Sequence, residues 1–212
     1  MNITSVIRVM ILSVGFTISL IVFRIFYSGS LMYLFFVWNL FLAGIPLGIT
    51  TILVQMKSKN IQWLLLTIWL LFFPNALYII TDLIHLKDRN PVPLWFDVIL
   101  IFSAAINGLI MAYISLQQVE LFLKTKFNDH KTDIILFACL FLGSFGVYIG
   151  RFLRLNSWDI LLHPFGLTFE VIQHFINPFQ HSRTWGMTIL LTGFFSIFYF
   201  TIKKLPALII KH

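Results

Sequence analysis

Six long apolar runs follow one another along the chain and are separated by shorter polar stretches. Each run is close to the roughly 20 residues that a helix needs to cross the hydrocarbon core of a bilayer. The first run ends in Arg24, Phe26 and Tyr27 rather than in a small-residue cleavage site, which indicates an uncleaved helix and not a signal peptide. The predicted spans cover residues 7–27, 31–55, 61–80, 94–116, 132–150 and 184–203. The pattern therefore predicts an all-α, polytopic bundle of about six transmembrane helices.

A different pattern occurs in the longest stretch between spans, residues 151–183. At helical spacing, apolar residues fall on one face and polar residues on the other, before Pro178 ends the pattern. The apolar face is Phe165, Phe169, Ile172 and Ile176, and the polar face is Glu170, Gln173, His174 and Asn177. We expect an amphipathic helix in the membrane interface between spans five and six, which either covers a site or anchors the connection.

Composition agrees with a membrane protein, because only 11% of the 212 residues are charged and 59% are hydrophobic. A water-facing globular surface needs about 25% charged residues. We expect residues 1–212 to form a single integral membrane domain. Cys139 is the only cysteine, which excludes an intrachain disulfide and a multi-cysteine metal site. The basic residues are scattered over the loops, which argues against a nucleic-acid partner and leaves membrane lipids as the expected one.

Lysine and arginine are unequally divided between the two sides of a six-span chain. One side holds nine: Arg8, Lys57, Lys59, Lys124, Lys126, Lys131, Lys203, Lys204 and Lys211. The other side holds six: Arg24, Lys87, Arg89, Arg151, Arg154 and Arg183. Because cytoplasmic loops retain positive charge, both termini are predicted to be cytoplasmic.

The third predicted span carries a polar stripe near its outer end. Asn75, Tyr78, Asp82 and His85 fall within an arc of about 80° at 100° per residue. Ionisable groups near hydrocarbon are costly and are often functional, so Asp82 and His85 are candidate acid–base residues, with Asn75 and Tyr78 as candidate binding residues.

Three asparagines, Asn39, Asn75 and Asn107, are individually better explained as hydrogen-bonding links between helices than as site residues. Pro74 removes one backbone hydrogen bond, and Asn75 or Asn39 could satisfy the carbonyl that it leaves.

Asp97, in the first turns of the fourth span, is predicted at the same depth as Asp82 and is a third candidate catalytic residue. Arg151 or Arg154 could pair with Asp82 or Asp97, because buried charges need partners. A purely structural ion-pair network is therefore an open alternative to a catalytic site.

The second polar segment, which follows the fifth span, suggests a binding site. Arg151 and Arg154 are spaced i, i+3, and two guanidinium groups suit a phosphate or carboxylate headgroup. Asn156 and Trp158 are further candidate binding residues, although Asn156 also fits a helix N-cap and Trp158 an interface anchor.

Two histidine and carboxylate pairs could instead bind a divalent metal such as zinc. Asp82 and His85 are spaced i, i+3, and Asp159 and His163 are spaced i, i+4. Asp159 is equally explained as an N3 residue that complements a helix dipole. His174 and His181 are spare candidate ligands that are expected to face the headgroups.

Four blocks of the sequence resemble the signature segments of a multi-pass membrane family, the domain of unknown function thirteen sixty-one. The blocks are Trp38 to Pro46, Phe73 to Leu86, Pro93 to Asp97 and Gly150 to Asp159. The resemblance spans nearly the whole chain. It implies a bacterial cytoplasmic membrane protein and brings no known activity with it.

The residues are compatible with two different functions. The first is an enzyme or lipid-handling protein whose outward-facing site acts on an anionic, lipid-linked substrate, with Asp82 and His85 as acid and base or as ligands of a metal that activates water. The second is a non-catalytic transporter, channel or assembly partner whose charges form structural ion pairs. A continuous polar path would favour the second, and beyond Asn107 the inner halves of the spans hold little that is ionisable.

Overall fold

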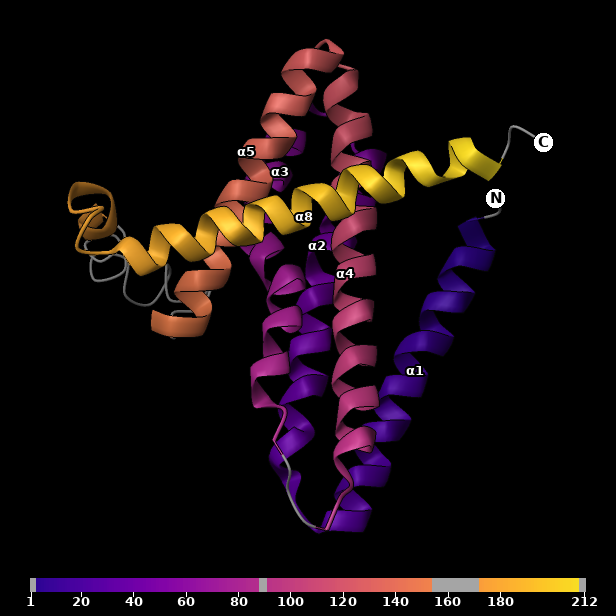
Figure 1. Cartoon of the computed structure of the whole chain (residues 1–212). Helices are drawn as coiled ribbons and strands as arrows, with labels where there is room; N and C mark the ends of the chain where they lie inside the picture. Colours follow the sequence, from indigo (N-terminus) through magenta and orange to yellow (C-terminus); the bar gives the residue numbers. More distant parts are fainter. Residues whose placement is uncertain (1–2, 88–90, 154–171, 210–212) are drawn as a thin grey trace. The chain divides into compact units, whose positions relative to one another are not determined.

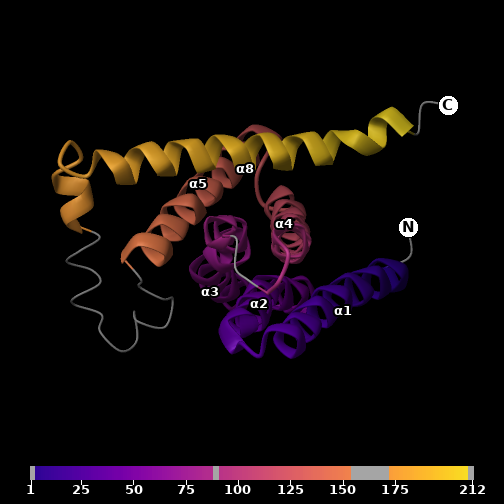
Figure 2. The same ribbon diagram turned by 60° about the horizontal axis from the view of Figure 1, so that its bottom comes forward.

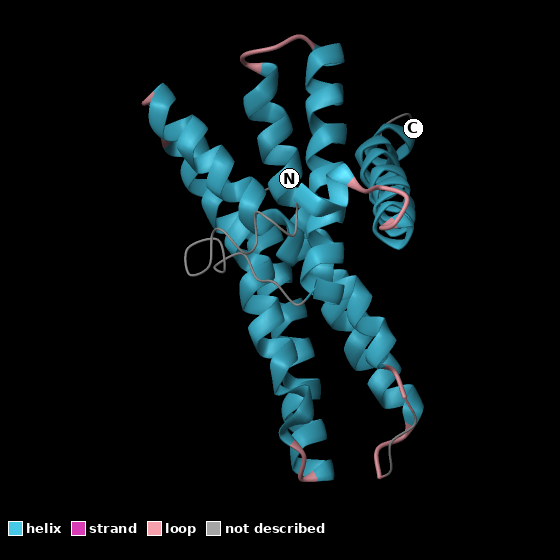
Figure 3. Cartoon of the chain, turned by 90° about the vertical axis from the view of Figure 1, so that its left-hand side faces the viewer, coloured by secondary structure: helices cyan, strands magenta, loops and turns pink. Residues whose placement is uncertain are grey.

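The computed structural model describes residues 3–87, 91–153 and 172–209, and every labelled element in these ranges is a helix (Figures 1 and 3). The chain divides into two compact units, Met1–Ser115 and Leu116–His212, which are described separately. Helix α4, Leu94–Lys124, begins in the first unit and ends in the second. The prediction of one domain over residues 1–212 stays a prediction.

Unit 1 contains α1, α2 and α3, the beginning of α4 and two short 3₁₀ segments. Seen from the end in Figure 2, α2 lies between α1 and α3. The bounds are Ile3–Ser28 for α1, Leu31–Leu34 for η1, Phe35–Gln55 for α2, Lys59–Tyr78 for α3 and Ile79–His85 for η2. The third span therefore changes from an α-helix to a 3₁₀-helix at Ile79, within the polar stripe.

Unit 2 contains the end of α4 and the helices α5, Asp129–Tyr148, and α8, Ser182–Ile209. Asn128 caps α5 by accepting a hydrogen bond from the Lys131 amide at 3.0 Å. Helix α5 continues into a π-helical segment, η3, Ile149–Leu153. Residues 172–176 are also helical, while Phe165 and Phe169 of the predicted interfacial helix lie outside the described residues.

Six helices of the described chain are long and apolar enough to cross a membrane, which confirms the predicted count. They are Ile7–Ser28, Leu31–Gln55, Lys59–His85, Leu94–Lys124, Asp129–Leu153 and Ser182–Leu205. The main difference from the prediction is in α4, which continues beyond residue 116 to Lys124. Hydropathy alone ended this span early because Gln117, Gln118 and Glu120 are polar, yet Glu120 is buried.

The turn between α1 and η1 depends on Gly29, whose φ of 66° lies in the left-handed region that favours glycine. The Gly29 amide donates to the Ile25 carbonyl at 2.8 Å and ends α1. Ser30 then caps η1 by accepting a hydrogen bond from the Met32 amide. This sharp reversal returns Tyr33 toward the end of α1.

Helix α4 approaches the end of α3 closely at Gly108. A Cβ atom at this position would lie 2.9 Å from the Ala76 carbonyl oxygen and 3.2 Å from Ile79 Cδ1. Small residues allow such close backbone approach between membrane helices. Gly108 therefore fixes where α4 packs against the segment that leads into Asp82 and His85.

Candidate functional site

Arg24 and Asp97 form a buried ion pair in unit 1. Arg24 Nε donates to Asp97 Oδ1 at 2.6 Å, and Nη2 donates to Oδ2 at 3.0 Å. The Tyr33 hydroxyl also donates to Asp97 Oδ2 at 2.9 Å, and the Arg24 guanidinium lies 3.6 Å from the centre of the Tyr33 ring. All three side chains are almost completely buried. Two parallel hydrogen bonds and a stacked ring are favourable geometry for a guanidinium outside water.

This arrangement changes the interpretation of Asp97, a candidate catalytic residue in the sequence. The expected partners were Arg151 or Arg154, but Arg24 and Tyr33 contact both carboxylate oxygens. A carboxylate held in this way is suited to joining α1, η1 and α4. The sequence did contain a signal for Arg24, because an arginine inside an apolar run requires a buried partner.

Asp82 and His85 form the second polar group of unit 1. Asp82 is 1% exposed, and its Oδ2 accepts a hydrogen bond from Asn39 Nδ2 on α2 at 2.9 Å. His85 Nε2 lies 4.0 Å from Asp82 Oδ1, and the His85 side chain is 44% exposed. A buried carboxylate thus stands behind a half-exposed imidazole, an arrangement that can orient the ring.

The polar stripe has a different geometry from the predicted one. The angle of 100° per residue holds only as far as Tyr78, because η2 turns by about 120° per residue. Ile79, Asp82 and His85 therefore stand above one another, which keeps Asp82 and His85 on one face. Asn75 and Tyr78 belong to α3 and are half-buried below them.

The asparagines have separate partners. Asn107 Nδ2 donates to Thr17 Oγ1 at 2.9 Å and to the Ser13 carbonyl of α1, which confirms its predicted role as a link between helices. Asn75 donates to the Phe72 carbonyl at 3.1 Å, within its own helix. Pro74 has no amide hydrogen, so the carbonyl of Leu70 lacks its usual helical donor. Neither the bond from Asn75 to Phe72 nor the bond from Asn39 to Asp82 reaches that carbonyl.

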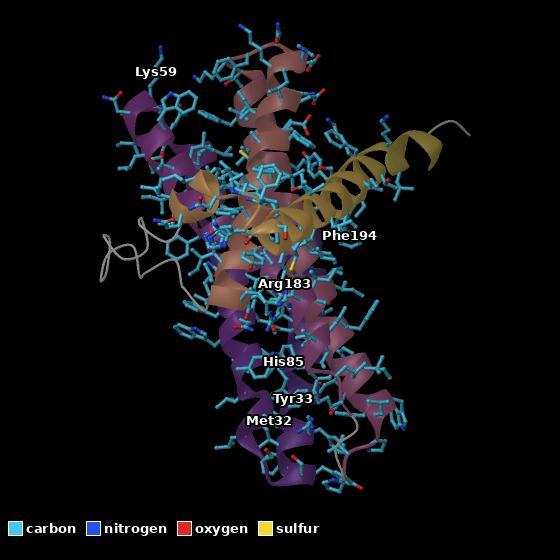
Figure 4. All side chains as sticks on the ribbon, turned by 60° about the vertical axis from the view of Figure 1, so that its left-hand side comes forward. Met32, Tyr33, Lys59, His85, Arg183 and Phe194 are labelled. Atoms are coloured by element: carbon cyan, nitrogen blue, oxygen red, sulfur yellow. The ribbon has the colours of Figure 1, made fainter. Side chains whose placement is uncertain are left out.

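His85 lies at the same end of unit 1 as Tyr33, and Lys59 lies at the opposite end (Figure 4). Large aromatic side chains of the neighbouring helix ends are exposed there, among them Trp38 at 53% and Trp95 at 62%. The Phe35 ring lies 5.5 Å from the His85 ring in an edge-on contact. Exposed tryptophans are typical of the membrane interface.

The second polar segment is described only in part. Arg151 lies half-buried in the π-helical segment η3, and π-turns are frequent at functional sites. The predicted residues Arg154, Asn156, Trp158, Asp159 and His163 lie outside the described residues. How Arg151 is placed relative to Asp82 and His85 stays a prediction.

The two spare histidines pack together in unit 2. The rings of His174 and His181 are 4.0 Å apart, and the Trp185 indole donates to the His174 carbonyl at 3.1 Å. His174 is 6% exposed, so the expectation that it faces the headgroups is wrong. Nearby, the Arg183 guanidinium lies 4.8 Å from the Phe152 ring centre.

Among residues 3–87, 91–153 and 172–209, three or more His, Cys, Asp or Glu side chains do not gather anywhere as a metal site would require. The predicted metal site combined Asp82 and His85 with Asp159 and His163, and the latter two lie outside these ranges. The described half of that site supplies one carboxylate and one imidazole.

One buried carboxylate was missed by the sequence interpretation. Glu120, near the end of α4, is 3% exposed and accepts hydrogen bonds from the Tyr199 hydroxyl at 2.5 Å and from Lys203 Nζ at 2.6 Å. Lys124 Nζ lies 3.1 Å from the same carboxylate. The predicted fourth span ended at residue 116 because the residues around Glu120 are polar, so Glu120 was expected in a loop. The spacing of four residues between Glu120 and Lys124 was the available sign that both belong to a helix.

The helices and their buried charge pairs define a polytopic α-helical membrane protein. Residues 38–198 match the family described as a protein of unknown function, DUF1361, and the chain belongs to that family. This confirms the resemblance seen in the sequence blocks. No curated protein and no solved structure matches the chain.

Proposed function

We propose that this protein acts at one membrane surface on an anionic, lipid-linked substrate, with His85 exchanging a proton and Asp82 orienting the imidazole. The observation that supports the proposal is the half-exposed His85 ring beside the buried carboxylate of Asp82. Asn39 fixes that carboxylate by donating to its second oxygen. A separation of 4.0 Å is compatible with a catalytic pair, because such contacts are often long without substrate and shorten when it binds.

The position of His85 favours a lipid-linked substrate over a soluble one. Trp38 and Trp95 are exposed at the same end of unit 1 and are typical of the membrane interface. Lys87, exposed two residues after His85, adds a positive charge that suits an anionic headgroup. Asn75 and Tyr78 lie below Asp82 and would contact the substrate from inside the membrane.

The proposal includes a location and a second set of binding residues. We place the protein in the bacterial cytoplasmic membrane with both termini in the cytoplasm, so that His85 faces outward, because nine basic residues oppose six. Arg151 and Arg154 would hold the anionic headgroup through paired guanidinium hydrogen bonds, assisted by Asn156 and Trp158.

Lipids that co-purify with the protein provide the test. Wild type, His85→Ala and Asp82→Asn would be purified in mild detergent, and their bound lipids identified by native mass spectrometry. Total lipid extracts of the expressing cells would be compared in parallel. We expect wild type to retain an anionic lipid-linked molecule and to alter the amount of a related product in the cell extract. We expect both variants to remain folded but to leave the amount of that product unaltered.

His130→Ala is the matched control, because His130 is an exposed histidine in the first turn of α5 and belongs to no candidate site. It should behave as wild type. Identical bound lipids and identical cell lipids for wild type, His85→Ala and Asp82→Asn would refute the proposal. Elemental analysis of the same samples tests a bound divalent metal.

The second candidate function is a non-catalytic transporter, channel or assembly partner. The buried contacts of Asp97 with Arg24 and of Glu120 with Lys203 favour it, since both carboxylates are used in joining helices. Under this alternative, His85→Ala and Asp82→Asn lose function only in proportion to lost thermal stability.

A further inference from the structure

A row of hydroxyl groups follows one face of α8 in unit 2. Thr184, Thr188, Thr192 and Ser196 repeat at intervals of four residues, and Tyr199 and Lys203 continue the same face. At 100° per residue, all six lie within an arc of about 120°. Thr184 and Thr188 are fully buried and Thr192 is 3% exposed. The opposite face carries exposed apolar residues, including Leu190, Phe194 and Ile197.

Several of these hydroxyl groups have no hydrogen-bond partner in the part of the chain that the structure describes. The oxygens Thr184 Oγ1, Thr188 Oγ1 and Ser196 Oγ are buried and unpaired. Hydroxyls in membrane helices commonly donate to the carbonyl four residues earlier, as Thr192 does to Thr188 at 2.7 Å. Leaving a buried polar group unsatisfied costs about 1 to 3 kcal/mol, and each such group in a folded protein calls for an explanation such as bound water.

Two further polar atoms in unit 2 share this property. Gln118 Oε1, on α4, and Thr132 Oγ1, on α5, are also buried without a partner. Bound water needs a polar site with two or more partners, and buried polar atoms without a protein partner are candidates for binding it.

The row extends through the apolar length of α8 and ends at a buried carboxylate. From residue 184 to residue 203 the helix rises about 28 Å, close to the roughly 30 Å of a hydrocarbon core. At its far end, Tyr199 and Lys203 both donate to Glu120. Lys124 and Asp129 are the other charged side chains of this cluster.

We propose that the hydroxyl row of α8 binds a file of water molecules that carries protons between the end of the helix near Thr184 and the carboxylate of Glu120. A proton moves along such a file by exchange, because each water accepts one proton and releases another. No oxidant, reductant or second substrate is required. The four hydroxyl side chains Thr184, Thr188, Thr192 and Ser196 carry no charge, and only the Glu120 end of the row is ionisable.

Proton flux in proteoliposomes tests the proposal. Purified full-length protein would be reconstituted with a pH-sensitive dye inside, and flux driven by a potassium gradient with valinomycin. We expect wild type to exceed protein-free liposomes, and Thr188→Val and Thr184→Val each to lower the flux about tenfold, the effect of losing one hydrogen bond to the moving proton's water. Glu120→Gln should lower it as well.

Thr50→Val is the matched control, because Thr50 is equally buried in α2 but its hydroxyl donates to the Pro46 carbonyl at 3.1 Å. It should leave the flux unchanged. Water contacts to threonine methyl groups, measured by nuclear magnetic resonance, should appear for Thr184 and Thr188 but not for Thr50. Wild-type flux equal to that of empty liposomes, or equal flux in wild type and both row variants, overturns the proposal. In a dry row, Thr188→Val would raise thermal stability by removing an unpaired hydroxyl, and that result also overturns it.

Discussion

Arg24 binds Asp97 through two hydrogen bonds across 73 residues of sequence, and Tyr33 completes the contact from the segment between them. The three side chains join the end of α1, the 3₁₀ turn η1 and the start of α4. Since both charges are buried, the contact holds these elements together only while each charge keeps its partner.

We predict that Asp97→Asn destabilises the protein by about 3 to 5 kcal/mol, because the Arg24 guanidinium is left buried without a counter-charge. Replacing both residues, as Arg24→Leu with Asp97→Leu, should recover much of that loss. Arg8→Gln, at an exposed position of α1, should change the stability little. Thermal unfolding in detergent measures all three. A fully stable Asp97→Asn protein would instead return Asp97 to the catalytic candidates.

A second prediction concerns Gly108, where a Cβ atom would meet the Ala76 carbonyl at 2.9 Å. Gly108→Ala must push α4 away from α3, at a cost of about 1 to 3 kcal/mol. Gly48→Ala in α2 is the control, since no heavy atom lies within 4 Å of the added Cβ there. That change should be neutral or slightly stabilising. Similar thermal stability of the two variants would contradict the close approach of α4 and α3.

The sequence predicted the spans well because hydropathy reports directly on the length of apolar helix that a bilayer requires. It predicted the alignment of Asp82 with His85 as well, since residues three apart share a face in both α and 3₁₀ helices. The change of helix type at Ile79 depends on packing against other helices and left no clear signal.

Long-range partners were not predictable in the same way. Arg24 and Asp97 are both visible as charges near apolar runs, but a pairing over 73 residues is decided by how α1 and α4 pack. Glu120 and Tyr199 are a similar case, 79 residues apart. The hydroxyl row of α8 was visible as a four-residue repeat, yet only burial distinguishes it from threonines that face lipid.

The third prediction is topological. Lys87 and Lys126 are both exposed, and the distribution of basic residues predicts that Lys126 is in the cytoplasm and Lys87 outside. In a Cys139→Ala background, Lys87→Cys should react with a membrane-impermeant maleimide in intact cells, whereas Lys126→Cys should react only after permeabilisation. The opposite labelling pattern would reverse the orientation and place His85 in the cytoplasm.

The final prediction concerns Arg151 and Arg154 as a headgroup site. The predicted topology puts these arginines on the side where the positive-inside rule disfavours basic residues, so a local anionic partner is expected. If that partner is a lipid phosphate, Arg151→Lys and Arg154→Lys keep the charge but lose the paired hydrogen bonds of a guanidinium. Anionic lipid should then raise the unfolding temperature of wild type more than that of either variant.

The measurement is thermal unfolding in detergent across phosphatidylglycerol, cardiolipin and phosphatidylcholine, with Arg8→Lys as the control because Arg8 is exposed at the start of the first span. If the partner is a protein carboxylate instead, added lipid makes no difference between wild type and variants. In that case, neutralising the arginine together with its partner aspartate should restore the stability lost in the single variants. Equal lipid responses of wild type, Arg151→Lys and Arg154→Lys would therefore exclude the headgroup site and support a structural ion pair, because only a ligand phosphate makes the stability depend on lipid charge.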